Sequence, residues 1–193
     1  MVILVLGLVL FLGAHSVRML ADGWRSGVIA RRGEGAWKGV YSLVSIAGLA
    51  LIVWGYGLAR QQPVLLWNPP RGMNHLAALL MLVSFVLLVA AYVPRNGIKA
   101  RLGHPMFAGV KVWAFAHLLA NGTLADVVLF GSFLVWAVLG FLAAKRRDRA
   151  AGVQRAPGNG GATAGTLLLG VAFWALFAFW AHAWLFGVRP LGA

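Results

Sequence analysis

The stretch LAALLMLVSFVLLVAAYV, residues 76–93, decides the fold, because its only polar side chains are Ser84 and Tyr92 and it contains no charge. A second stretch, VVLFGSFLVWAVLGFLAA at residues 127–144, is equally apolar. A helix of about 20 apolar residues crosses the roughly 30 Å hydrocarbon core of a bilayer. The strands of a membrane barrel would instead alternate apolar and polar residues, which neither stretch does. Both stretches therefore predict transmembrane helices.

The composition of the whole chain supports this interpretation. Of 193 residues, 61% are hydrophobic and 11% are charged, and the mean hydropathy is +0.83. A compact soluble domain has no surface on which to place so many apolar side chains. Cysteine is absent, which excludes disulfides and thiolate ligands. We expect an all-α integral membrane bundle of about six transmembrane helices, forming a single domain over residues 1–193.

Six apolar segments can be marked along the chain. The first resembles the apolar region of a signal peptide, but no basic residue precedes it and no cleavage pattern follows, so we interpret it as a span. The fourth is short and lies between Pro105 and the turn signal Asn121-Gly122, which predicts a tight helical hairpin with the fifth. The segments are 2–20, 37–59, 73–93, 106–120, 124–144 and 165–188.

Basic residues predict the orientation in the membrane. Three lie in residues 21–36, three in 94–105 and five in 145–164, whereas the intervening loops hold few. Loops rich in Lys and Arg stay in the cytoplasm, so we expect a multi-pass inner-membrane protein with both termini in the periplasm. Residues 145–164, basic and then rich in Gly and Pro, predict a flexible cytoplasmic linker. The basic residues behind the net charge of +13 thus orient the helices in the membrane. We expect membrane lipid, not nucleic acid, as the partner.

A few polar residues inside the spans are candidates for chemistry, because intramembrane polar groups are costly. His15 and Arg18 lie three residues apart on one face of the first span, and His117 and Asn121 lie four apart on the fourth. Such histidines can serve simply as hydrogen-bonded ties between helices. Alternatively, they ligate a metal, because neutral imidazole is its commonest protein ligand.

Haem suits these candidates better than a bare divalent ion. The four acidic residues, Asp22, Glu34, Asp126 and Asp148, all lie at helix ends or in loops. Haem supplies its own ring nitrogens and needs one or two axial side chains in an apolar pocket. With a rise of about 1.5 Å per residue, His15 lies roughly 8 Å and His117 roughly 17 Å from the cytoplasmic ends of their spans, a gap that helix tilt can close. Arg18 would then pair with the haem propionates.

The central string HPMFAGVKVWAFAHLLANG, residues 104–122, and the following VLFGSFLVW, residues 128–136, resemble the signature of the NnrU family. His-Ser-Val-Arg at residues 15–18 and Tyr-Ser-Leu-Val-Ser at residues 41–45 also fit. The resemblance implies a membrane protein with a link to nitric oxide and nitrite metabolism in denitrification. Plant relatives in this family include a 15-cis-zeta-carotene isomerase that uses haem b.

The resemblance implies that His15 and His117 match the haem ligands of that isomerase. One position departs from it, because Ala114 stands where the isomerase has a cysteine, so ligand switching through a thiolate is excluded. We expect haem b at these histidines, and isomerase-like or redox chemistry on a lipophilic or nitrogen-oxide small molecule. Whether the chain is an enzyme is left open.

Two alternatives stay open at this stage. His-Pro-Met-Phe-Ala-Gly at residues 104–109 also resembles an element of isoprenylcysteine-type methyltransferases, although Gly103 replaces their arginine. The chain could equally be a non-catalytic assembly or regulatory factor in which the histidines only tie helices together.

Overall fold

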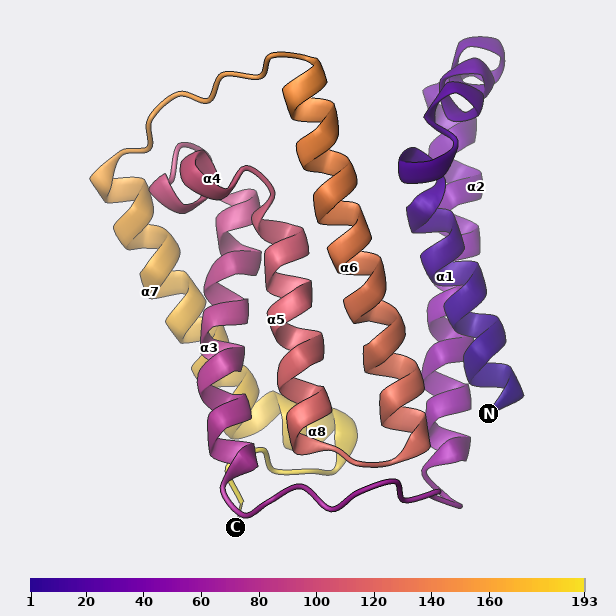
Figure 1. Cartoon of the computed structure of the whole chain (residues 1–193), viewed down its shortest axis with the longest axis vertical. Helices are drawn as coiled ribbons and strands as arrows, with labels where there is room; N and C mark the ends of the chain where they lie inside the picture. The colour runs from indigo at the N-terminus through magenta and orange to yellow at the C-terminus, as the bar shows by residue number, and fades with distance from the viewer. Residues whose placement is uncertain (193) are drawn as a thin grey trace. The chain divides into compact units, whose positions relative to one another are not determined.

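The structure, a computed structural model, describes residues 1–192 and is built from helices (Figure 1). Within these residues β pairing is limited to two isolated bridges, which confirms the all-α class. The elements are α1 (Val2–Leu20), α2 (Asp22–Ala59), α3 (Met73–Tyr92), α4 (Gly97–Leu102), α5 (Pro105–Ala120), α6 (Leu124–Ala150), α7 (Gly160–Leu176), a π-helical turn η1 (Phe177–Ala181) and α8 (His182–Phe186).

Five helices are long and apolar enough to cross a membrane: α1, α2, α3, α6 and the continuous run Gly160–Phe186. The fourth expected span, which is α5, is apolar but has 16 residues, so it is roughly 24 Å long. Large side chains on the spans are exposed, such as Leu168 at 72% and Val53 at 65%. Exposed apolar faces of this extent fit contact with lipid. The prediction of a multi-pass membrane protein is confirmed.

The chain divides into two compact units. The first comprises residues 1–66 and 123–136, and the second comprises residues 67–122 and 137–192. Helix α6 contributes its first half to the first unit and its second half to the second. Each unit is described by itself.

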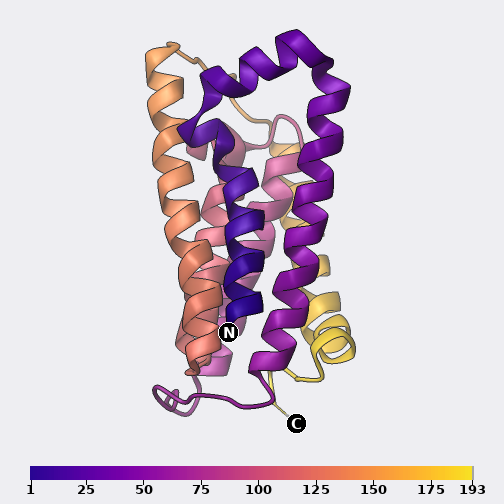
Figure 2. The ribbon, with the colours of Figure 1, turned by 90° about the vertical axis from the view of Figure 1, so that its right-hand side faces the viewer.

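Glycines bring α1 and α2 into backbone contact in the first unit. A Cβ on Gly55 would lie 2.3 Å from the backbone nitrogen of Leu4, and one on Gly48 would lie 2.7 Å from that of Phe11. On α1, a Cβ on Gly7 would lie 2.6 Å from the nitrogen of Ile52. Small residues at such spacings let membrane helices approach closely where no hydrophobic effect drives them together. The two helices run antiparallel, side by side, in both ribbon views (Figures 1 and 2).

The structure differs from the expectation of a loop over residues 21–36. Helix α2 begins at Asp22, and a break at Gly33, with φ of 81° and ψ of 157°, separates this first part from the span. Figure 2 shows the chain changing direction there, at the top of the view. The rings of Trp24 and Trp37 meet edge to face at 5.8 Å across the break. Glycine adopts this backbone conformation without steric cost, so the polar segment can be helical and still turn into the span.

In the second unit, α3 packs against α5 and α7. The Ser84 hydroxyl, fully buried, donates to the carbonyl of Gly109 on α5 at 2.9 Å. The indole nitrogen of Trp174 on α7 donates to the carbonyl of Ala78 on α3 at 2.9 Å. Polar side chains in the spans thus satisfy backbone carbonyls of neighbouring helices, as a medium without water requires.

The segment predicted as a linker, 145–164, is partly helical. Helix α6 continues to Ala150 and α7 begins at Gly160, so residues 151–159 form the connection between them. The amide of Asn159 donates to the carbonyl of Arg95 at 2.8 Å, and its side chain accepts from the amide of Ala162 to cap α7. The mobility of this segment stays a prediction.

Candidate functional site

His15 lies on α1 in an aromatic surrounding. Its ring stacks on Phe11 of the preceding turn at 4.2 Å between centroids. Tyr41 of α2 lies at 5.2 Å and Trp136, the last residue of the first unit, at 6.1 Å. The side chain is half-buried. The sequence placed His15 on an apolar stripe, and the structure adds rings from two other helices.

One hydrogen bond fixes the protonation of the His15 ring. Nδ1 lies 2.7 Å from the carbonyl oxygen of Phe11, four residues earlier on the same helix. Because a carbonyl oxygen can only accept, Nδ1 must carry the proton, and Nε2 of the neutral ring keeps the lone pair. Metal-binding histidines commonly donate their second nitrogen in this way. His15 is therefore prepared, in its local chemistry, to offer Nε2 to a metal.

His117 on α5 repeats the arrangement. Its Nδ1 lies 2.9 Å from the carbonyl oxygen of Trp113, again four residues earlier, and the two rings are 5.4 Å apart. The same argument assigns the proton to Nδ1 and the lone pair to Nε2. The side chain is half-buried.

The two other predicted site residues flank these histidines. Arg18 is exposed in the last turn of α1, on the face that it shares with His15. Asn121 ends α5, and its side-chain amide donates to the carbonyl of His117 at 2.8 Å. Asn121 thus satisfies a terminal helix carbonyl, a structural role that the sequence alone did not indicate. His15 and Arg18 belong to the first unit, whereas His117 and Asn121 belong to the second.

The remaining histidines have different surroundings. His182 also has rings beside it, Phe177 at 5.8 Å and Phe186 at 5.0 Å, and it places Nδ1 2.7 Å from the carbonyl oxygen of Val188, but this hydrogen bond is exposed. His75 is exposed at the start of α3. The Nε2 atom of His104 lies 2.7 Å from a carboxylate oxygen of Asp148, 44 residues later in the chain. Among residues 1–192 there is no group of three or more His, Cys, Asp or Glu arranged to share a metal ion.

Asp148 forms an ion-pair cluster that the sequence analysis missed. Its Oδ2 accepts from the Arg155 guanidinium as well as facing His104. The guanidinium lies on Gly103, where φ is 80° and a Cβ would meet it at 2.6 Å. Only a glycine allows both that backbone conformation and that approach. The cluster joins the α6–α7 connection to the α4–α5 turn.

Asp126 is the second carboxylate with a role that the sequence did not show. It is 4% exposed, and its Oδ1 accepts from the Tyr56 hydroxyl at 2.6 Å. Its Oδ2 accepts from the hydroxyl of Thr123 at 2.6 Å and from the amide of the same residue at 3.0 Å. This is a capping box at the start of α6, closed by a side chain from α2.

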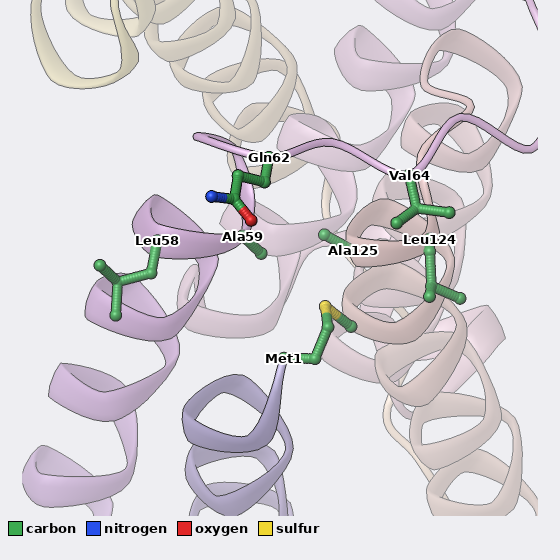
Figure 3. Close-up of a pocket in the computed structure, with 7 residues that line it drawn as sticks. All are labelled: Met1, Leu58, Ala59, Gln62, Val64, Leu124 and Ala125. Carbon is green, nitrogen blue, oxygen red and sulfur yellow. The ribbon is translucent and has the colours of Figure 1, made fainter.

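A pocket of about 180 Å³ lies at this end of the first unit (Figure 3). The amide of Gln62 is the polar side chain in an otherwise aliphatic lining that includes Met1 and Leu58. Pockets for drug-sized ligands and cofactors are usually about 300–1,000 Å³. We therefore assign no cofactor to it.

The family described as NnrU protein matches residues 3–190, nearly the whole chain. No curated protein and no solved structure matches the chain.

Proposed function

The chain belongs to the NnrU family, and on that premise we propose that it is a membrane protein that binds haem b, for which the imidazole of His15 and that of His117 are each a candidate axial ligand. The observation that carries the proposal is shared by both side chains. Each donates Nδ1 to the carbonyl four residues earlier, which leaves the lone pair of the neutral ring on Nε2, the nitrogen that would bind the iron.

The donor set fits this cofactor. Haem iron accepts one or two axial nitrogen ligands and is stabilised by an apolar surrounding. Phe11, Tyr41 and Trp136 surround His15 with rings, and Trp113 lies against His117. The same rings limit the access of water to the two imidazoles.

Arg18 supplies the charge that the porphyrin carboxylates need. It lies one turn after His15, on the same face, and its side chain is exposed. A guanidinium binds a carboxylate through two parallel hydrogen bonds. In this proposal Arg18 binds the propionates. Asn121 stabilises the last turn of α5 by donating to the carbonyl of His117.

Bound haem would supply an iron centre that can change its redox state for a lipophilic or nitrogen-oxide partner. The residues of this chain would bind the porphyrin, orient both imidazoles and exclude water. The inner membrane is the proposed location, with both termini in the periplasm, because the basic loops alternate along the chain.

An absorption spectrum of the purified protein tests the proposal directly. The full chain is expressed in cells supplied with haem precursor and purified in detergent. The expected result is a Soret band that shifts on reduction with dithionite. A colourless protein that also takes up no added haemin would overturn the proposal and leave the histidines as helix ties.

A further inference from the structure

Phe141, in the second half of α6, has two lysine ammonium groups near its ring. Nζ of Lys111 on α5 lies 3.9 Å from the ring centroid, and Nζ of Lys145, one turn further along α6, lies 5.7 Å from it. Cations within about 6 Å of an aromatic face are attracted by its quadrupole. One ring thus gathers two like charges in the second unit.

Both lysines lie on helices, with a side-chain contact between those helices nearby. A Cβ on Gly140 would lie 2.3 Å from the ring of Phe107, so this side chain of α5 contacts α6 at Gly140. Lys111 and Lys145 are both half-buried. Their positions are therefore set by helical backbone and not by a loop.

Among residues 1–192, no carboxylate forms an ion pair with either lysine. The chain has four acidic residues. The carboxylates are engaged elsewhere: Asp22 with Arg25, Glu34 with Lys38, Asp126 with Tyr56 and Thr123, and Asp148 with His104 and Arg155. Two neighbouring ammonium groups repel each other, so an anion from outside the chain would stabilise them.

The position of the two lysines near the end of the apolar spans limits the kind of anion that can reach them. Lys145 directly follows the apolar stretch 124–144. Lys111 lies six residues after Pro105, or roughly 9 Å along α5, a distance that a lysine stem can span to reach the headgroup region. Basic pockets between transmembrane helices bind the phosphate groups of anionic lipids.

We propose that Lys111 and Lys145, gathered on the ring of Phe141, bind a phosphate group at the membrane surface, the phosphodiester of an anionic phospholipid. The lysine ammonium group binds phosphate as a point charge. The ring of Phe141 holds the two ammonium groups near each other in the absence of the anion, which lowers the cost of binding it. The inference does not depend on haem binding.

Native mass spectrometry of the full-length protein in a neutral detergent tests this site. The protein is mixed with dioleoyl phosphatidylglycerol or with dioleoyl phosphatidylcholine, and retained lipid is counted. We expect retention of phosphatidylglycerol over phosphatidylcholine, and about tenfold weaker retention in the double variant Lys111→Gln and Lys145→Gln. Lys38→Gln removes the same kind of charge, from an exposed side chain paired with Glu34, and is expected to leave retention unchanged.

Two further measurements are needed. One identifies the source of the phosphate, and the other shows whether a variant loses binding because it misfolds. If inorganic phosphate displaces phosphatidylglycerol at millimolar concentration, free phosphate is the ligand; if it does not, the lipid is. The double variant with arginine at both positions keeps the charge and should keep most of the binding. Equal retention of both lipids, or loss in the arginine variant as well as in the glutamine variant at unchanged thermal stability, would overturn the proposal.

Discussion

The hydroxyl of Tyr56 donates to Oδ1 of Asp126 at 2.6 Å and joins the end of α2 to the start of α6, 70 residues later. Thr123 occupies the other carboxylate oxygen through its amide and its hydroxyl. A buried carboxylate costs several kcal/mol unless it is fully hydrogen-bonded. The contact between α2 and α6 in the first unit therefore depends on the hydroxyl of Tyr56, which binds the capping carboxylate of Asp126.

Replacing Tyr56 by Phe removes the partner of Oδ1 and leaves it buried without a donor. We expect the free energy of unfolding to fall by about 1–3 kcal/mol. Thermal unfolding of the purified protein in detergent measures the change. Tyr92→Phe is the matched control, because Tyr92 is 77% exposed, and an equal effect of the two variants would contradict the role of Tyr56.

The glycine contact between α1 and α2 predicts opposite results for two neighbouring substitutions. Gly55→Ala places a Cβ 2.3 Å from the nitrogen of Leu4, so the helices must separate, at a cost of about 1–3 kcal/mol. Gly57→Ala meets no atom within 4 Å, and alanine favours a helix over glycine by about 0.5–1 kcal/mol. Thermal unfolding should rank Gly57→Ala at or above the wild type and Gly55→Ala below it; the reverse order would refute the close packing.

The Asp148–Arg155 pair predicts that the α6–α7 connection is held in place. Arg155→Gln removes the charge that pairs with Asp148 and lies on Gly103. We expect faster cleavage within residues 151–159 by proteinase K, which does not require arginine at the cut site. Arg149→Gln, at an exposed position near the end of α6, should leave the cleavage rate unchanged. An unchanged rate in Arg155→Gln would mean that the segment is already mobile, as its composition predicts.

The loop charges predict which side of the membrane each segment occupies. A periplasm-active phosphatase fused after Arg155 should be inactive, because the five basic residues of 145–164 hold that segment in the cytoplasm. The same enzyme fused after Ala193 should be active. Comparable protein levels by immunoblotting make the comparison fair, and the opposite pattern of activity would invert the proposed topology.

The spans could be predicted from the sequence because lipid imposes a simple rule on them. Residues 2–20 were marked as the first span, and α1 has those bounds. The third was expected at 73–93 and is Met73–Tyr92. Pro105 was expected at the start of the short fourth span and is its first residue. Apolar runs identify such helices because every backbone group in hydrocarbon must be bonded within its own segment.

The remaining features depend on contacts that no local pattern encodes. The helical part of α2 before Gly33 is polar, so hydropathy gave no signal for it. The partners Tyr56–Asp126 and His104–Asp148 are 70 and 44 residues apart. At the site, the sequence indicated which histidines face an apolar stripe, but not the Nδ1 bond that selects the ligand nitrogen. That bond depends on a side-chain rotamer, which packing determines.

The haem proposal predicts different results for three histidine substitutions. His15→Ala and His117→Ala each remove one imidazole that presents Nε2, so each should weaken the Soret band or change the spin state of the iron. His182→Ala is the matched control, because His182 is also half-buried and also bonds Nδ1 to a carbonyl, at 2.7 Å, but that hydrogen bond is exposed. If the hydrogen bond alone selected ligands, all three variants would lose haem equally. We expect the His182 variant to keep the wild-type spectrum, although the rings of Phe177 and Phe186 lie at 5.8 and 5.0 Å, because its Nδ1 hydrogen bond is exposed, whereas the Nδ1 hydrogen bonds of His15 and His117 are partly buried. If His182→Ala lost haem and the other two variants had normal spectra, the family and the fold would stand, but the assignment of His15 and His117 as ligands would be wrong.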